Sequence, residues 1–382
     1  MRKILNLIKN NAILVISGIL ALLSCFIVKP DIQYVGYINS RVLAILFCLM
    51  LIVAALGRIG TFDVLTNKLL SKVKSYRGIS LLMSLMAFFL SMFLTNDVAL
   101  VTLVPFAIMV LEPFAENRKL MFTLIIMTVA ANLGSMLTPI GNPQNLYLFA
   151  KYKLGLGEFL YLMLPYSLLA LGLVVALTFI LVRGTKALPN VSKKYDEHVS
   201  VIKLVIYLAL FILNILTVVD VVPYLVSLLI TMVVMMIMDR RSFLKVDYNL
   251  LLTFVFFFIL IGNIGRIDTI TGALTGLVSK NPVLTAILSS QIISNVPAAM
   301  LLSAFTGDGR SLIIGTNLGG LGTLIASMAS LITYRFHASF SRNNKENGNG
   351  IQENYVFNFT WINIVVLILL YGLYLLLHLK IG

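Results

Sequence analysis

AANLGSMLTPIGNPQNL, from Ala130 to Leu146, interrupts a long apolar run with polar residues, glycines and two prolines. Pro139 and Pro143 each lack a backbone N–H donor, and Gly141 between them loosens the backbone, so a continuous helix cannot pass through this stretch. Inside a bilayer, backbone outside a helix is tolerated only against protein or a water-filled cavity. The stretch therefore predicts a broken transmembrane helix, the device with which secondary transporters build a site near the membrane midplane.

A second, weaker copy of this stretch lies in the other half of the chain, where residues 317–327 read NLGGLGTLIAS. Two further segments recur in the same order: FLTNDVAL, residues 93–100, matches IISNVPAA, residues 292–299, and ALGRIG, residues 55–60, matches NIGRID, residues 263–268. Three ordered correspondences predict an internal duplication. The matched pairs are Gly57 with Gly265, Arg58 with Arg266, Ile59 with Ile267, Thr95 with Ser294, Asn96 with Asn295, Asn132 with Asn317, Leu133 with Leu318, Gly134 with Gly319, and Thr138 with Thr323.

The composition is that of a polytopic membrane protein. Of 382 residues, 59% are hydrophobic and only 12% are charged, and the mean hydropathy is +0.99. The net charge of +14 comes from basic residues scattered in short loops, with no basic stripe of the kind that binds nucleic acid. We therefore expect an all-α integral membrane protein with the lipid bilayer around it and no nucleic-acid partner.

The apolar segments divide into plain spans, hairpins and broken spans. The stretches 79–111 and 282–305 are each interrupted by a polar tip, and we expect two half-length helices forming a re-entrant hairpin in each. The broken spans are 120–150 and 311–334. The plain spans are expected at 11–28, 42–57, 159–182, 201–218, 221–238, 250–264 and 357–379.

Counting the hairpins as non-crossing predicts nine crossings and two repeats of inverted topology, because the span at 201–218 has no counterpart in the first half. We expect a first repeat at 1–182, a linker and connecting helix at 183–220, and a second, inverted repeat at 221–382. Most of the 29 lysines and arginines then lie on the side of the N-terminus. The positive-inside rule thus predicts a cytoplasmic N-terminus and an external C-terminus, in the plasma (inner) membrane.

The hairpin tips and helix breaks bring together helix N-termini, which suit the oxygens of an anion, and unwound carbonyls with hydroxyl and amide oxygens, which suit Na⁺. The alternative is that these side chains only cap buried helices. The candidate substrate-binding residues are Thr95, Asn96, Asn142, Ser294, Asn295 and Thr323. The candidate ion-coupling residues are Asp97, Asn96, Thr138, Gly141, Asn295 and Gly319, and a transient Na⁺ could bind at Asn96, Gly141, Asn295 and Gly319.

Among the charged residues, Asp97 is the carboxylate that this topology places inside the membrane, where a charge is costly and functional by default. It could pair with a transported cation, carry a proton, or stabilise the N-terminus of the following helix. Arg58 and Arg266 each follow the end of a span, and we expect them to anchor helix C-termini. The histidines His198, His337 and His378 are expected at the surface.

With these tips and breaks, the chain resembles the ion transporter superfamily, which includes divalent anion/sodium symporters, citrate transporters, arsenite efflux permeases and some sodium/proton antiporters. The tips Thr95-Asn96-Asp97 and Ser294-Asn295-Val296 are similar to the Ser-Asn-Thr signatures of dicarboxylate carriers. The resemblance implies paired inverted repeats and a homodimer that moves by an elevator mechanism. Asp97 stands where those carriers have Thr, which is closer to the arsenite and citrate-metal branches, and Val296 also departs from the signature.

The sequence therefore predicts a secondary active transporter of a small anion, a di- or tricarboxylate, coupled to Na⁺ or H⁺ and without a cofactor. The alternatives are an arsenite or oxyanion efflux permease and a sodium/proton antiporter. A passive anion channel is the alternative from a different class, and it would need a continuous pore. An enzyme is not expected, because no nucleophile with a base and no metal-ligand cluster lies at membrane depth.

Overall fold

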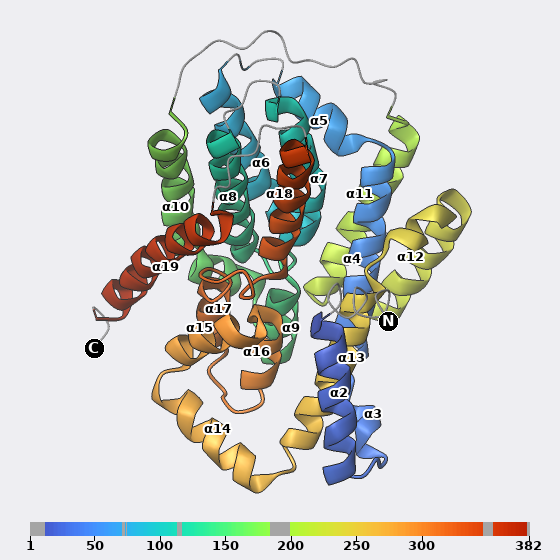
Figure 1. Cartoon of the computed structure of the whole chain (residues 1–382). Coiled ribbons are helices and arrows are strands. Elements are labelled where there is room, and N and C mark those ends of the chain that lie inside the picture. Colours follow the sequence, from blue (N-terminus) through green and yellow to red (C-terminus); the bar gives the residue numbers. More distant parts are fainter. Residues whose placement is uncertain are drawn as a thin grey trace.

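The computed structural model describes residues 12–70, 73, 75–112, 117–183, 199–346 and 354–379, and all the elements within them are helices (Figure 1). In the first part of the chain these are α2 (Ala12–Ile27), α3 (Gln33–Tyr37), α4 (Ser40–Arg58), α5 (Thr61–Leu70), α6 (Tyr76–Leu94), α7 (Asn96–Leu111), α8 (Asn117–Gly134), η2 (Ser135–Leu137), α9 (Pro143–Tyr152) and α10 (Leu156–Leu181). In the second part they are α11 (Val201–Val218), α12 (Tyr224–Met238), η3 (Arg240–Lys245), α13 (Tyr248–Ile264), α14 (Asp268–Lys280), α15 (Pro282–Ile293), α16 (Asn295–Leu302), α17 (Gly309–Leu318), α18 (Met328–Glu346) and α19 (Tyr355–Leu379).

Each predicted span coincides with a helix or a pair of helices, which confirms an all-α polytopic membrane protein. Within the described ranges, six helices are long and apolar enough to cross a membrane, and α2, α12 and α13 are shorter apolar helices. Most of the predicted linker, residues 184–198, lies outside the described residues. The number of crossings and the division into inverted repeats stay predictions.

Burial separates a central helix from peripheral ones. The apolar window that includes α8 is 94% buried within the protein, whereas those of α10, α11 and α19 are only 28%, 28% and 22% buried. The exposed faces of these three helices carry large apolar side chains such as Leu168, Ile212 and Leu376. Contiguous apolar surface of this extent requires a non-aqueous environment, so these helices face lipid.

Both predicted hairpins are present as helix pairs joined by a single residue. α6 and α7 meet at Thr95, and α15 and α16 meet at Ser294. The second pair has half-length arms of 12 and 8 residues, about 18 and 12 Å long, too short to cross a bilayer core of about 30 Å. In the first pair the expectation of half-length arms is wrong for α6: its 19 residues, about 28 Å, are long enough to cross. That each helix pair enters and leaves the membrane on the same side therefore stays a prediction.

The two broken spans run through the molecule in opposite senses. In Figure 1, α6, α7, α8 and α18 occupy the upper part and α9, α15, α16 and α17 the lower part, and the tips and breaks lie where the two groups meet. The first span ends α8 at Gly134, passes through η2 and an irregular segment, and resumes at Pro143, whose missing N–H is harmless at the first helical position. The second is interrupted between Leu318 and Met328.

The two repeated arginines, expected to anchor helix C-termini, form ion pairs with aspartates. Arg58 contacts Asp239 at 3.0 Å, and Arg266 contacts Asp31 at 2.8 Å. Burial alone would raise the pKa of the Asp239 carboxyl, but hydrogen bonds from Ser242 and Arg58 outweigh it and hold that pKa below its ordinary value. Neither arginine lies at the tips or breaks.

The expectation of a surface position is wrong for His337. This histidine is 9% exposed and lies in α18, with its ring 4.6 Å from the ring of Tyr355 on α19. The reason is that α18 continues to Glu346, well beyond the predicted end of the span at residue 334, so His337 packs against a neighbouring helix. His378 is exposed at the end of α19, as expected, and His198 lies outside the described residues.

Gly134→Ala is expected to destabilise the protein by about 1–3 kcal/mol, the usual cost of overpacking. A methyl group at this position would lie closer than 3.0 Å to the backbone carbonyl of Phe88 on α6, and backbone cannot move aside as a side chain can. Thermal unfolding of the purified protein in detergent measures the effect. Gly172→Ala on α10 is the control, since nothing lies within 4 Å of its added methyl group. Equal unfolding temperatures for the two variants would contradict this packing role.

Candidate functional site

The two hairpin tips adopt the same unusual backbone conformation. Thr95 has φ 71° and ψ 149°, and Ser294 has φ 73° and ψ 155°. A residue with a side chain rarely adopts positive φ, and such strain persists only where the surroundings hold it in place. The helix that follows each tip begins at an asparagine, which is Asn96 for α7 and Asn295 for α16. The matched conformation agrees with the predicted duplication of these tips.

Both tips contact the same dipeptide in the second helix break, Ala326–Ser327. On the second tip, the Asn295 backbone N–H and the Ser294 hydroxyl donate to the Ala326 carbonyl, at 3.0 and 3.3 Å. On the first tip, the Asn96 side-chain amide donates to the Ser327 hydroxyl at 3.5 Å and more closely to Asn132 Oδ1, at 2.9 Å. The structure thus brings together two tips that are about 200 residues apart in sequence.

The breaks pack against the hairpins in matching ways. The Thr138 hydroxyl donates to the carbonyl of Met92, and the Thr323 hydroxyl donates to the carbonyl of Gln291, at 3.4 Å. Met92 and Gln291 each lie three residues before a tip. A Cβ atom at Gly134 would likewise meet Ser91, and one at Gly319 would meet Ser290, each four residues before a tip. The pairs matched by sequence therefore share local geometry.

Two hydrogen bonds link the two halves across the centre in a symmetric way. The Asn132 amide donates to the Ser330 hydroxyl at 3.4 Å, and the Asn317 amide donates to Asn145 Oδ1 at 2.7 Å. In the duplicated sequence Asn317 corresponds to Asn132, and Ser330 corresponds to Asn145. Each half thus uses the first position of the pair as donor and the second as acceptor, the pattern expected of a self-complementary, two-fold-related contact.

Four helices begin at the tips and breaks: α7, α9, α16 and α18. The N-terminus of a helix carries unpaired N–H groups and a partial positive charge. The contacts of Asn96 with Ser327 and of Asn295 with Ala326 hold the starts of α7, α16 and α18 close together. At the start of α9, Asn145 accepts from Asn317, which lies at the end of α17, where the second break begins. Three helix N-termini, those of α7, α16 and α18, therefore lie together at the tips and the second break.

Several buried polar atoms near these helix starts have no hydrogen-bond partner within the described part of the chain. They are Asp97 Oδ1, Asn142 Oδ1, Gln144 Nε2 and Asn317 Oδ1. Buried polar groups in proteins are nearly always paired, so each such atom calls for an explanation. Three of them are oxygens, which suit a cation, and the carboxylate oxygen of Asp97 can also take up a proton; the fourth is an N–H donor, which suits an anion. These four atoms are therefore available to a polar ligand.

The predicted site residues take different places around this centre. Asn96, Asn142, Ser294 and Asn295 are each no more than 5% exposed, although they are polar. Thr138 accepts from the Gly141 N–H, and Asn142 donates to the Ser135 hydroxyl at 2.6 Å. The main chain around Gly319 and Thr323 is bonded to one side chain: Gln291 Nε2 donates to the Gly319 carbonyl, and Gln291 Oε1 accepts the Thr323 N–H.

Sequence reasoning missed three residues of this centre as site residues: Asn132, Gln291 and Ser327. Asn132 Oδ1 accepts from both Asn96 and Ser327, so it joins the first tip to the second break. The recurrence of asparagine in both NLG motifs was a usable signal for Asn132. Gln291 has no polar counterpart at Met92, and its role follows from contact in three dimensions.

The sequence is similar to a known family and to several transporters and membrane proteins. The citrate transporter family matches residues 4–307. The uncharacterized transporter MJ0456 of Methanocaldococcus jannaschii is 34% identical over 322 residues, 83% of this chain and 86% of that protein. The inner membrane protein YbiR of Escherichia coli is 33% identical over 323 residues, 82% of this chain and 84% of its own length. The silicon efflux transporter LSI3 of rice is 31% identical over a shorter region of 157 residues, 41% of this chain and 32% of its own. The chain therefore belongs to the citrate transporter family and is a multi-pass membrane transporter.

Proposed function

We propose that the protein is a secondary active transporter of a small anion, a di- or tricarboxylate, coupled to Na⁺ or H⁺. The observation that carries this proposal is the convergence of both tips on Ala326–Ser327, where the helices α7, α16 and α18 begin. A carboxylate brings oxygens that accept hydrogen bonds from backbone N–H groups at helix starts. Membership of the citrate transporter family supports the same class of substrate.

The coupling ion has two candidate kinds of ligand in the same centre. The buried oxygens of Asn142 and Asn317, together with main-chain carbonyls at the breaks, are neutral ligands of the type that holds Na⁺. Asp97 is a carboxylate with a buried oxygen, and it is suited to a cation or to a proton. We place the coupling ion beside Asp97 and the transported anion at the asparagine-led helix starts of α7 and α16.

Oxyanion efflux is a second candidate function. The rice relative is named a silicon efflux transporter, and a protein of Dictyostelium discoideum that is 26% identical over 178 residues is named a putative transporter arsB. Both cover less than half of this chain. Asp97 at the first tip also favours this branch over the carriers with neutral tips. A sodium/proton antiporter would use Asp97 alone and leave the positive helix ends without a ligand.

Alternating access distinguishes a transporter from a passive anion channel, which would need a continuous pore. The side chains of Asn96 and Asn295 are buried and the tips are bonded to the second break, so an ion path through this point requires movement. We propose that the hairpins and broken helices move together relative to the other helices, as in an elevator. The homodimer that the resemblance implies is a prediction of the same model.

Uptake by proteoliposomes tests the proposed function. The panel consists of labelled citrate, other di- and tricarboxylates, phosphate, sulfate and arsenite, each with separately imposed Na⁺ and proton gradients. Saturable accumulation of a carboxylate against its gradient, driven by one of the two ions, is the expected result. Flux of arsenite but not of carboxylates would select the second candidate. Flux that does not saturate and follows only the anion's own gradient would identify a channel and contradict the proposal.

The orientation of the termini is tested by tags at two places. We propose that residues 191–200, which lie mostly outside the described residues, are cytoplasmic and that the C-terminus is external. A protease or an impermeant thiol reagent added to intact cells should reach the C-terminal tag and leave the linker tag untouched. Accessibility of both tags from the same side would contradict the nine-crossing topology.

A further inference from the structure

A cavity of about 500 Å³ lies away from the tips, between the turn from α3 to α4, helix α9 and helix α13. Its wall includes Tyr37 and Arg41 from the turn, Tyr147 and Lys151 from α9, and Phe258 from α13. Gly262 permits the close approach of α13 to this turn, because a Cβ atom there would collide with the Tyr37 ring. Pockets for small molecules usually measure about 300–1,000 Å³, so the cavity is large enough for a small ligand.

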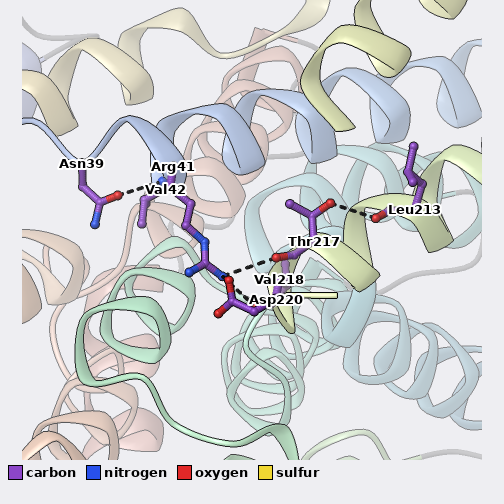
Figure 2. Close-up of polar contacts among 7 residues, drawn as sticks. All are labelled: Asn39, Arg41, Val42, Leu213, Thr217, Val218 and Asp220. Atoms are coloured by element: carbon purple, nitrogen blue, oxygen red, sulfur yellow. Dashed lines mark hydrogen bonds and ion pairs between the residues drawn. The ribbon is translucent and has the colours of Figure 1, made fainter. Parts of the chain in front are cut away.

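The charge on the cavity wall is positive. None of the described residues that line it is an aspartate or glutamate. The guanidinium of Arg41 is engaged elsewhere: it contacts Asp220 at 2.8 Å and donates to the carbonyls of Thr217 and Val218 at the end of α11, as Figure 2 shows. Arg266, which donates to the Tyr37 hydroxyl, is likewise paired with Asp31. Lys151 is therefore the cation of this cavity that has no ion-pair partner within the described residues.

Hydroxyl groups hold the Lys151 ammonium in place. Its Nζ donates to the Ser303 hydroxyl at 2.9 Å and to the Tyr147 hydroxyl at 3.4 Å, and these two hydroxyls lie 3.0 Å apart. Within the described ranges, Lys151 forms no salt bridge. An ammonium has three donors, so one remains for a ligand. The rings of Tyr147 and Phe258, 5.9 Å apart, add an apolar wall beside it.

A neighbouring cavity provides the contrast. It measures about 380 Å³, shares Arg41 with the first cavity and is also lined by Lys153 and Asp220. Asp220 is paired with Arg41, but its carboxylate lies on the wall itself, so an anion beside Lys153 would meet repulsion as well as attraction. The two lysines are two residues apart at the end of α9, yet of these two cavities only that of Lys151 lacks an acidic residue among its described lining.

We propose that the Lys151 cavity is a second binding site, for a small carboxylate anion, separate from the site at the tips. The Lys151 ammonium binds the carboxylate, and the Tyr147 and Phe258 rings contact the carbon chain of the ligand. Lys151 belongs to α9, and its partner Ser303 follows the end of α16; both helices start at the central site. Other residues that line the cavity come from α3, α4 and α13. The site thus lies where an anion could be held before it reaches the centre. The identity of the ligand as the transported anion rests on the proposed function.

Affinity labelling of the purified wild-type protein tests the site without measuring transport. Pyridoxal 5′-phosphate is an anionic aldehyde that condenses with an uncharged lysine amine to an imine and water, and borohydride reduces the imine to a stable amine. Peptide mass spectrometry then measures modification at Lys151 and at Lys153. We expect Lys151 to be modified about tenfold more than Lys153 at low reagent concentration, the ratio for one additional charge-assisted contact. Citrate should protect Lys151 and leave Lys153 unchanged.

Ser303→Ala provides the matched variant, because it keeps the amine and removes the hydroxyl that positions it. The preference for Lys151 should fall toward equality with Lys153 in this variant. Equal modification of the two lysines in the wild type, or modification of Lys151 that citrate does not reduce, would overturn the proposal. Protection by phosphatidylglycerol in nanodiscs but not by citrate would also overturn it, because the cavity would then bind lipid. If citrate protects Lys151 from labelling but proteoliposomes do not accumulate any carboxylate, the proposed function is refuted and this binding site is still supported.

Discussion

Asn132→Ala is expected to lower the rate of anion uptake by about two orders of magnitude. Asn132 Oδ1 accepts from Asn96 at 2.9 Å and from Ser327 at 3.0 Å, so truncation leaves two buried donors unpaired between the first tip and the second break. Each lost hydrogen bond is worth about 0.5–1.5 kcal/mol, and about 1.4 kcal/mol corresponds to a factor of ten. The expected loss is in positioning the first tip, and therefore in the affinity of the central site.

Thr333→Val is the control for Asn132→Ala. The Thr333 hydroxyl accepts from Thr128 at 2.9 Å and joins the same two helices, α8 and α18, one or two turns away from the break. Valine has nearly the same shape, so the variant removes one buried hydrogen bond between these helices without touching the tips. Thermal stability should fall in both variants, whereas uptake should fall steeply only in Asn132→Ala. Equal losses of uptake would mean that helix packing in general, and not the tip network, limits transport.

The pattern of polar interruptions in apolar runs was sufficient to predict the helices, the two tips and the two breaks. The reason is physical: a glycine- and proline-rich stretch inside a membrane segment has few structures open to it. The pairing of Asn96 with Asn295 and of Thr138 with Thr323 was also predicted, and the matching hydrogen bonds of Thr138 and Thr323 agree with it.

What sequence could not predict is how far helices extend and which polar side chains meet across the centre. The length of α6 and the continuation of α18 past residue 334 depend on packing and not on hydropathy. Gln291 looks like an ordinary polar residue before a tip, and only the approach of Gly319 and Leu321 reveals that it holds the second break. Contacts between residues far apart in sequence have no periodic signal.

Asp97→Asn is expected to fold normally and to lose ion-driven accumulation of the anion. Asp97 stands in the first turn of α7, and its Oδ1 is buried without a hydrogen-bond partner in the described part of the chain. Asparagine keeps the size of the side chain and removes a charge at the helix N-terminus, an interaction worth about 0.3–1 kcal/mol, so the free energy of unfolding should change by about 1 kcal/mol or less. The measurements are thermal stability and uptake across pH, each with and without a Na⁺ gradient.

The three roles for Asp97 predict different outcomes. A helix-stabilising carboxylate would be expected to accept a hydrogen bond from the backbone, but Oδ1 of Asp97 accepts none within the described ranges, and the residue's own N–H donates to Asn96 Oδ1 at 2.9 Å. If Asp97 carries a proton, wild-type uptake depends on pH and the Asp97→Asn variant loses this dependence. If Asp97 pairs with Na⁺, the variant loses its response to a Na⁺ gradient at every pH.

Asp268→Asn is the matched control, because Asp268 also lies in the first turn of a helix, α14, but is exposed and far from the tips in sequence. It should leave both accumulation and pH dependence unchanged. Wild-type accumulation and wild-type pH dependence in Asp97→Asn would reduce Asp97 to a charge at a helix end. The coupling ion would then have to be bound by neutral oxygens, and Asn142 and Asn317, whose buried Oδ1 atoms lack partners within the described residues, would become the residues to replace next.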